Sequence, residues 1–237
     1  MKRRRFLKRI SSAGLVLALG AGSAQQKVFG QSPAISTGGK SRVMVARRPG
    51  KLLVDGKPNP PEISSLLSQA VCTLVDEKDP SSAWKKIFSP EDVVGIKINT
   101  LGGKGISNRP ETVQAVCEAL QEAGIPPQQI IVWDRLSQEL QRAGFEIVTE
   151  GDRPRCYGSD VLGDRAYRHR TETSGSIGSC FSNILSKQCT ALINMGVLKD
   201  HDLSGISIAM KNLFGVIHNP NRYHFDIYKD PYLPDLA

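Results

Sequence analysis

Residues 93–105 read VVGIKINTLGGKG, an apolar run rich in β-branched residues that ends in a glycine loop. Such a run favours a buried strand, and the glycines favour a turn directly after it. A helix is expected from Arg109 to Ala123, between a capping Asn108 and a closing Gly124. A second apolar run at 130–133 predicts another buried strand. Strand, helix and strand at this spacing form a βαβ unit, whose strands pair in parallel with a right-handed crossover.

The alternation of helices and strands continues on both sides of this unit. Upstream, a helix is expected over Glu62–Val75, whose apolar residues recur on one face. Downstream, the pattern predicts a helix at Ser137–Ala143, strands at Phe145–Val148 and Ala191–Leu198, and a helix at Ser204–Leu213. Residues 151–180 have weak periodicity and are expected to be irregular or inserted. The fold class is therefore α/β, with a mainly parallel sheet and helices on both faces.

The composition is that of a globular protein of 237 residues, 40% hydrophobic and 23% charged. It excludes disorder, collagen and coiled coil. The formal charge of +8 is concentrated at the start, because residues 1–24 hold six basic residues and no acidic one, which leaves +2 for the remainder. A body so close to neutral offers no electrostatic footprint for a polyanion, so no nucleic acid is expected as a partner.

The first 24 residues are typical of an export signal. RRRFLK at 3–8 precedes an apolar stretch at 13–21 and small residues up to Ala24. The stretch is shorter than the roughly 20 residues that cross a bilayer, so no stable membrane span is expected in the mature chain. RRRFLK resembles the twin-arginine motif Arg-Arg-x-Phe-Leu-Lys, which implies export to the periplasm by the twin-arginine translocase. An ordinary secretory signal or an uncleaved anchor is the alternative.

Three regions follow from these patterns: the signal at 1–24, a polar linker at 25–40, and an α/β domain at 41–237 with its βαβ core from about residue 93. The five cysteines are scattered and contain no Cys-x-x-Cys pair, so the sequence holds no iron–sulphur or zinc-ribbon motif. Cys117 shares an apolar helical stripe and is expected to be buried. Cys180 and Cys189 would pack, pair or ligate.

Three of the expected strands end in polar residues that can do chemistry. They are Lys97 and Asn99, Asp134 and Arg135, and Lys199, Asp200 and His201. Because ligands of parallel α/β sheets bind outside the carboxyl ends of the strands, these groups are expected to share one crevice. The alternative is that Asp134 only caps a helix and that Lys199 is a solvated surface charge.

The glycine loop at 102–105 offers backbone N–H groups that can cradle an anion before a helix. It matches neither Gly-x-x-x-x-Gly-Lys-Ser/Thr nor Gly-x-Gly-x-x-Gly, the two common nucleotide patterns. A carboxylate or a phosphorylated small molecule fits better, with Arg109 at the helix start as a further anion ligand.

Lys211 is a candidate base or nucleophile. If 204–213 is helical, Ser207 and Ile208 share the face of Lys211, which draws its amine towards buried residues. Burial makes a lysine lose its proton more readily, which suits such a role. The alternative is a lysine whose stem lies along the surface.

Three histidines are candidate proton carriers or metal ligands. His201 lies between Asp200 and Asp202, either of which could orient its ring. His218 and His224 flank a loop with turn residues and are further metal candidates, although no cysteine pair accompanies them.

Several segments together resemble one known family. They are VGIKINTLGG (94–103), VWDR (132–135), GSCFS (178–182), LKDH (198–201) and AMKN (209–212). The resemblance, over about residues 90–237, is to the family catalogued as domain of unknown function 362. It implies a bacterial exported α/β domain, in relatives sometimes joined to iron–sulphur modules, with no settled activity. Relatives continue with further strands and helices beyond the region of His224, so a sequence ending at Ala237 implies a truncated domain.

A fainter similarity reaches the nickel-pincer lactate racemase family. Residues 108–110, Asn-Arg-Pro, resemble its Thr-Arg-Pro motif, and His201, Gly205 and Lys211 fall where its His-x3-Gly…Lys residues lie. Ala209 and Met210 replace the glycine and arginine that precede the lysine there. The similarity implies a metal-containing cofactor.

The sequence therefore predicts an exported protein with a small-molecule or metal-cofactor site at the carboxyl ends of its strands. The residues expected to hold an anionic substrate are Lys97, Asn99, Arg109, Arg135, Lys199, Asp200 and Asn212. His201 and Lys211 would transfer protons or attach a cofactor, with Asp134 orienting a neighbour. A non-catalytic cofactor-handling or binding module, accessory to iron–sulphur or other redox proteins, is the alternative. In a third interpretation these residues only cap and pack.

Overall fold

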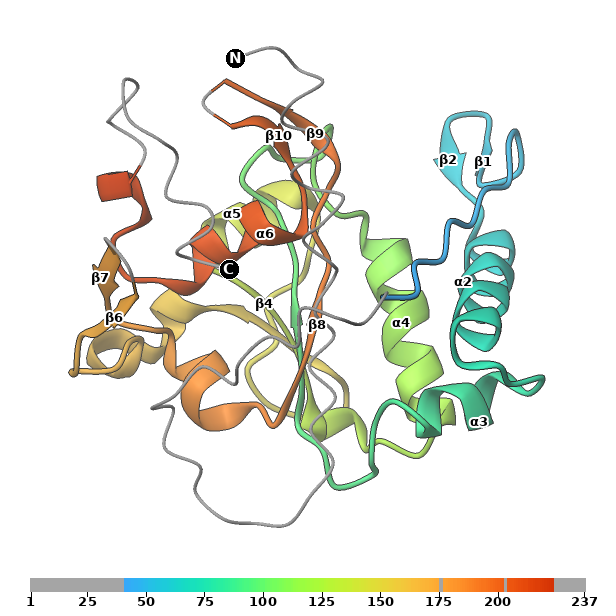
Figure 1. Ribbon diagram of the computed structural model, residues 1–237, viewed down its shortest axis with the longest axis horizontal. Coiled ribbons are helices and arrows are strands. Elements are labelled where there is room, and N and C mark those ends of the chain that lie inside the picture. Colours follow the sequence, from blue (N-terminus) through green and yellow to red (C-terminus); the bar gives the residue numbers. More distant parts are fainter. Residues whose placement is uncertain (1–40, 175–176, 203, 224–237) are drawn as a thin grey trace.

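A four-stranded parallel sheet forms the centre of the computed structural model, which describes residues 41–174, 177–202 and 204–223 (Figure 1). Its strands are β3 (Val94–Lys97), β4 (Ile130–Asp134), β5 (Arg155–Gly158) and β8 (Ala191–Asn194). They lie in the order β5-β4-β3-β8, and every pairing is parallel. The expected α/β class and parallel sheet are confirmed.

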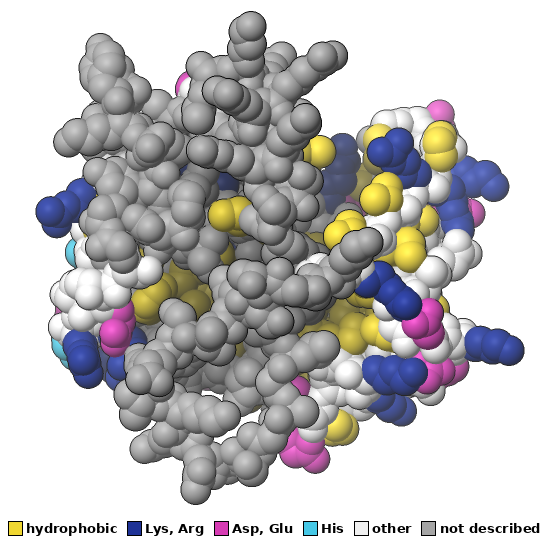
Figure 2. Space-filling model, viewed as in Figure 1, with side chains coloured by type: hydrophobic (Ala, Val, Ile, Leu, Met, Phe, Trp, Pro, Cys, Tyr) yellow, Lys and Arg dark blue, Asp and Glu magenta, His cyan; other side chains and the backbone are white. Residues whose placement is uncertain are grey.

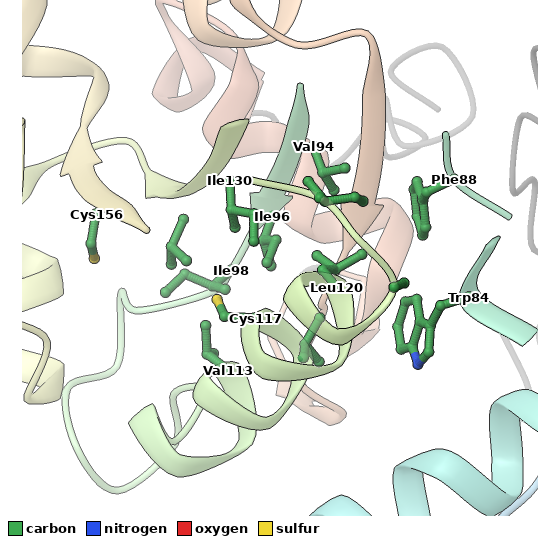
Figure 3. Close-up of a cluster of buried hydrophobic side chains, with 14 of the residues drawn as sticks. Trp84, Phe88, Val94, Ile96, Ile98, Val113, Cys117, Leu120, Ile130 and Cys156 are labelled. Carbon is green, nitrogen blue, oxygen red and sulfur yellow. The ribbon is translucent and has the colours of Figure 1, made fainter. Parts of the chain in front are cut away.

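One face of the sheet is covered by long helices. α4 (Pro110–Glu122) packs directly on the strands, and α2 (Pro60–Val75) and α3 (Pro80–Lys85) pack outside it (Figure 1). Figure 3 shows Val113, Cys117 and Leu120 of α4 pointing towards strand residues such as Ile96. The expected helices over 62–75 and 109–123 are confirmed, as is the burial of Cys117, which raises its pKa to about 12.

Short helical turns cover the opposite face. Ile131, Trp133 and Tyr157 pack there against Ile184 and Val216. The covering segments are η2 (Ser159–Arg165), the π-turn η3 (Ile184–Gln188) and η4 (Leu213–Val216). Helical segments thus lie on both faces, as expected, but only one face carries long helices.

The remaining elements lie around this core. They are the hairpins β1 (Leu53–Val54) with β2 (Lys57–Pro58), β6 (Glu172–Ser174) with β7 (Ile177–Ser179) and β9 (Lys199–His201) with β10 (Gly205–Ser207), and the helical segments η1 (Pro127–Gln129), α5 (Ser137–Ala143), α6 (Ala209–Asn212) and η5 (Pro220–Tyr223). α5 was expected and ends at Gly144, whose φ of 100° is the left-handed conformation that glycine adopts readily.

The expected helix at 204–213 is wrong. The chain instead forms the antiparallel hairpin of β9 and β10, in which Ile206 pairs with Asp200, and only then the four-residue helix α6. Gly205 has φ +72°, which reverses the chain where a helix would have continued. Lys211 therefore does not share a helical face with Ser207, and its surroundings are set by tertiary contacts.

The fourth strand of the sheet comes from a segment expected to be irregular. Phe145–Val148 was expected to be a strand, but Val148 makes only an isolated antiparallel bridge to Cys156. The sheet position is taken by β5, whose residues Cys156 and Tyr157 pair with Val132 and Trp133 of β4. A four-residue strand has too few alternating positions for its sequence to show a period, so pairing with β4 defines it.

The surface is mixed in charge. On the face shown in Figure 2, Lys and Arg side chains on the side of α2 are interspersed with acidic ones, so no broad patch of one sign forms there. None of the helices within the described ranges is both long and apolar enough to cross a membrane. The predicted signal and linker, at 1–24 and 25–40, lie outside the described residues.

Candidate functional site

A buried ion pair joins the carboxyl ends of the two central strands. Lys97 ends β3 and Asp134 ends β4, and Lys97 Nζ lies 2.7 Å from Asp134 Oδ1. Lys97 is 1% exposed and Asp134 is 4% exposed. Lys97 Nζ also donates to the Ile98 carbonyl at 2.6 Å and to Asn212 Oδ1 at 3.0 Å. Since an ammonium has three N–H groups, its donors are fully used inside the protein.

Asp134 is equally saturated. Its Oδ2 accepts from the backbone N–H and the hydroxyl of Thr100 at 2.8 Å and 2.7 Å, and its Oδ1 accepts from the Arg135 backbone N–H at 2.8 Å as well as from Lys97. Asp134 therefore binds the loop after β3 rather than capping a helix with its side chain. Neither Lys97 nor Asp134 presents a vacant polar atom to a ligand.

Asn212 extends this network to the end of β8. Its amide donates to the Lys97 carbonyl at 3.1 Å and to Asn194 Oδ1 at 2.8 Å, and Asn194 in turn donates to the Ala209 carbonyl at 2.8 Å. α6 is thus fixed across the ends of β3 and β8. The contact is close enough that a Cβ added at Gly215 would lie 2.9 Å from Lys97 Nζ. Sequence reasoning assigned no role to Thr100, although it lies within the 94–103 segment, or to Asn194.

Lys199 lies beside this buried network and is held by neutral groups. Its Nζ donates to Asn99 Oδ1 at 2.7 Å and to the Ile106 carbonyl at 3.4 Å. No carboxylate of the described residues lies within ion-pair distance of its ammonium. Burial lowers the pKa of Lys199, and the charge of Asp134 opposes that shift. Lys199 is therefore a partly buried cation without an adjacent counter-charge.

The polar partner of Lys199 is itself fixed by a neighbour. Asn108 Oδ1 accepts from the Asn99 backbone N–H at 2.6 Å, and the Asn108 backbone N–H donates to the Asn99 carbonyl at 3.0 Å. The expectation that Asn108 caps the helix is wrong, because the N-cap of α4 is Arg109 and that end has no side-chain cap. The Asn108 side chain instead holds the backbone of Asn99, whose side chain accepts from Lys199.

Lys211 completes a pair of neighbouring cations. Burial, and secondarily the charge of Lys199, lower the pKa of Lys211 to about 8. Its Nζ lies 3.6 Å from the centroid of the Phe214 ring, a cation–π contact that partly compensates the burial of the charged form. We call Lys199 and Lys211 the lysine pair.

The other predicted site residues lie further from the pair or more exposed. His201 follows Lys199 by two residues on β9, so both side chains lie on the same side of the hairpin and the exposed Asp200 lies on the other. His201 Nδ1 accepts from the Ser204 backbone N–H at 3.3 Å. Arg109 is exposed at the start of α4. Burial raises the pKa of Tyr167, and a hydrogen bond between its hydroxyl and Arg135 opposes that rise.

The donor set does not fit a directly ligated metal within the described part of the chain. No group of three or more His, Cys, Asp or Glu residues gathers there. His218 is exposed and meets the Tyr167 ring edge-on at 5.1 Å, while His224 lies outside the described residues. Cys180 and Cys189 are free thiols, and burial raises the pKa of Cys189 to about 12. We therefore derive no chemical step through a metal.

The expected convergence of the three strand ends is present in the structure. Lys97 touches Asp134, and Lys199 reaches Asn99, two residues past β3. Lys199, however, stands on the β9–β10 hairpin that follows β8 rather than on a strand of the central sheet. The residues at this edge therefore form two layers. In the buried layer the polar groups of Lys97 and Asp134 bond to each other and to their neighbours, and the lysine pair lies outside it.

These features define a parallel α/β domain with a polar site at the carboxyl ends of its strands. A family profile described as Domain of unknown function (DUF362) matches residues 94–231, more than half of the chain. The chain belongs to this family. No curated protein and no solved structure matches it.

Replacing Lys97 by Met is expected to lower the free energy of unfolding by about 3–5 kcal/mol, because it leaves the buried Asp134 carboxylate without its partner. Urea denaturation followed by circular dichroism measures the change. Lys85→Met, an exposed lysine on α3, is the matched control and should change stability by about 0.5 kcal/mol or less. A loss for Lys97→Met as small as that of the control would show that the ion pair does not hold the fold.

Lys211 is expected to react with acetic anhydride with a half-maximal rate near pH 8, because its amine is already largely neutral above that pH. Mass spectrometry of digested protein reports each lysine separately. Lys199→Gln removes the neighbouring charge and should move the Lys211 midpoint upwards. A Lys211 midpoint at the ordinary lysine pKa of about 10.4 would contradict the assignment.

Proposed function

We propose that this protein is an exported protein that binds a small anionic molecule at the lysine pair and transfers a proton to or from it through Lys211. The observation that carries the proposal is the state of Lys199, a partly buried ammonium that, among the described residues, is held by neutral oxygens and lies near a second lysine. Two like charges at such a place repel each other and are each disfavoured by burial. A carboxylate or phosphate placed between them would relieve both costs.

The proposed division of labour follows from the contacts. Lys199, oriented by Asn99, would hold the anion, since its donors are directed by neutral partners that a ligand can replace or supplement. Lys211 would give or take the proton, because a pKa of about 8 lets the amine exist in both forms near neutral pH. His201, on the same side of β9 as Lys199, would exchange that proton with solvent.

The buried Lys97, Asp134 and Asn212 network would act as a positioning framework in this mechanism. Its donors and acceptors are satisfied within the protein, so it would fix α6 and the loop after β3 and thereby set the separation of Lys199 and Lys211. Because the hydrogen-bonding groups of Asp134 are all occupied within the protein, a second candidate function is also supported. With Asp134 occupied, the lysine pair could bind an anion without turning it over, as a non-catalytic binding or cofactor-handling module would.

Anion binding is expected to weaken about tenfold or more in Lys199→Gln, since a charge-assisted hydrogen bond of about 1.5–3 kcal/mol is lost. Isothermal titration calorimetry of the full chain with acetate, lactate and inorganic phosphate measures the Kd. Lys85→Gln should leave it unchanged. The Kd should also rise as the pH passes through about 8, where Lys211 loses its charge.

The two candidate functions separate in the same experiment. Binding that is accompanied by exchange of the α-hydrogen of lactate with deuterated solvent, and lost in Lys211→Gln, supports proton transfer. Binding without exchange of a ligand hydrogen supports the non-catalytic module. The absence of binding for all three anions, or an unchanged Kd in Lys199→Gln, would overturn the lysine pair as an anion site.

Export is the second part of the proposal and depends on the RRRFLK segment. Replacing Arg3 and Arg4 together by Lys is expected to leave most of the protein in the cytoplasm, because the twin-arginine pathway requires the arginine pair. Cell fractionation and immunoblotting measure the distribution. Arg5→Lys, at the variable position of the motif, is the matched control and should be exported normally. Equal export of the two variants would argue for an ordinary secretory signal.

A further inference from the structure

A pocket lies on the sheet face opposite α4, at the edge formed by β5. Its volume is about 510 Å³, within the range of small-molecule sites. Apolar walls come from Val93, Val161 and Leu162, and polar groups come from Thr149, Arg155, Tyr157 and Gln188. Arg155 begins β5, so the pocket reaches the amino end of that strand, whereas the lysine pair lies beyond the carboxyl ends.

Arg155 supplies an uncompensated positive charge to this pocket. Its guanidinium forms no ion pair with a described carboxylate, and its Nε is buried without a hydrogen-bond partner. No acidic residue is among those that line the pocket. An arginine in such a place has unused donors arranged for a planar carboxylate.

One of the neighbouring polar groups, the Gln188 amide, adds a further donor. The Tyr157 hydroxyl donates to Gln188 Oε1 at 2.8 Å, which uses the acceptor of that amide and leaves its NH₂ group available. The pocket thus combines one cation, an amide donor and apolar walls. A ligand that matches it has acceptor oxygens with one negative charge at one end and an apolar body.

We propose that this pocket is a second binding site, for a monocarboxylate with an apolar chain such as a medium-chain fatty acid. The carboxylate would pair with Arg155 and accept from Gln188, and the chain would lie against Val93, Val161 and Leu162. A single cation favours one negative charge over two. The site is separate from the lysine pair and does not depend on the function proposed for that pair.

Calorimetric titration of the full chain with octanoate tests the proposal, with 1-octanol as the uncharged ligand of the same chain length. Octanoate is expected to bind about tenfold or more tightly than octanol. Arg155→Gln should remove that difference, while Arg165→Gln, an exposed arginine at the end of η2, should preserve it. Lys199→Gln should leave octanoate binding unchanged.

A variant that keeps Arg155 provides an independent measurement. Val161→Phe enlarges a wall residue that is 44% exposed, and it should weaken octanoate and octanol alike without disturbing the core. Circular dichroism confirms that each variant is folded. If Arg155→Gln unfolds, Arg155→Lys replaces it, because this variant keeps the charge. Arg155→Lys should still bind octanoate more tightly than octanol. Equal affinity for octanoate and octanol, no octanoate binding, or loss of octanoate binding in Lys199→Gln would each overturn the proposal.

Discussion

The arrangement of the carboxyl edge depends on one buried ion pair, Lys97 with Asp134. Taking two charges out of water is costly, and such a pair is stable only when every remaining donor and acceptor is satisfied. Here the ammonium makes three hydrogen bonds and the carboxylate accepts four. Because these bonds come from β3, β4, the loop after β3 and α6, the pair determines how those segments meet.

That network also explains how residues far apart in sequence produce a site. Asn212 bonds to Lys97, 115 residues earlier, and adjoins Lys211, so the contact that satisfies Lys97 also brings Lys211 to the same edge. Asn99 is fixed by Asn108 and in turn orients Lys199. An inner layer whose charges are paired thus lies beside Lys199, which has no adjacent carboxylate among the described residues, and from this asymmetry we infer anion binding.

Both proposed sites contain a cation that has no adjacent carboxylate among the described residues. Paired surface charges such as Arg48 with Glu62 have a partner within the protein, whereas Lys199 and Arg155 have no adjacent carboxylate among the described residues. Lys199 stands among polar groups and Arg155 among apolar walls. Each site therefore has one cation without an adjacent carboxylate in the described part of the chain, but the surroundings of that cation differ. We infer a small polar anion as the ligand of Lys199 and an amphipathic carboxylate as the ligand of Arg155.

The sequence by itself determined the parallel α/β core, in which Lys97 and Asp134 end neighbouring strands. Those features follow from contiguous runs such as 93–99 and 130–133, whose periodicity and caps are local properties. Only the tertiary structure decided that β5 rather than 145–148 completes the sheet, that a hairpin replaces the helix expected at 204–213, and that Lys97 is neutralised while Lys199 is not. The place of β5 depends on its pairing with β4, and the neutralisation of Lys97 depends on partners 37 and 115 residues away. Burial and charge compensation arise only when such partners meet.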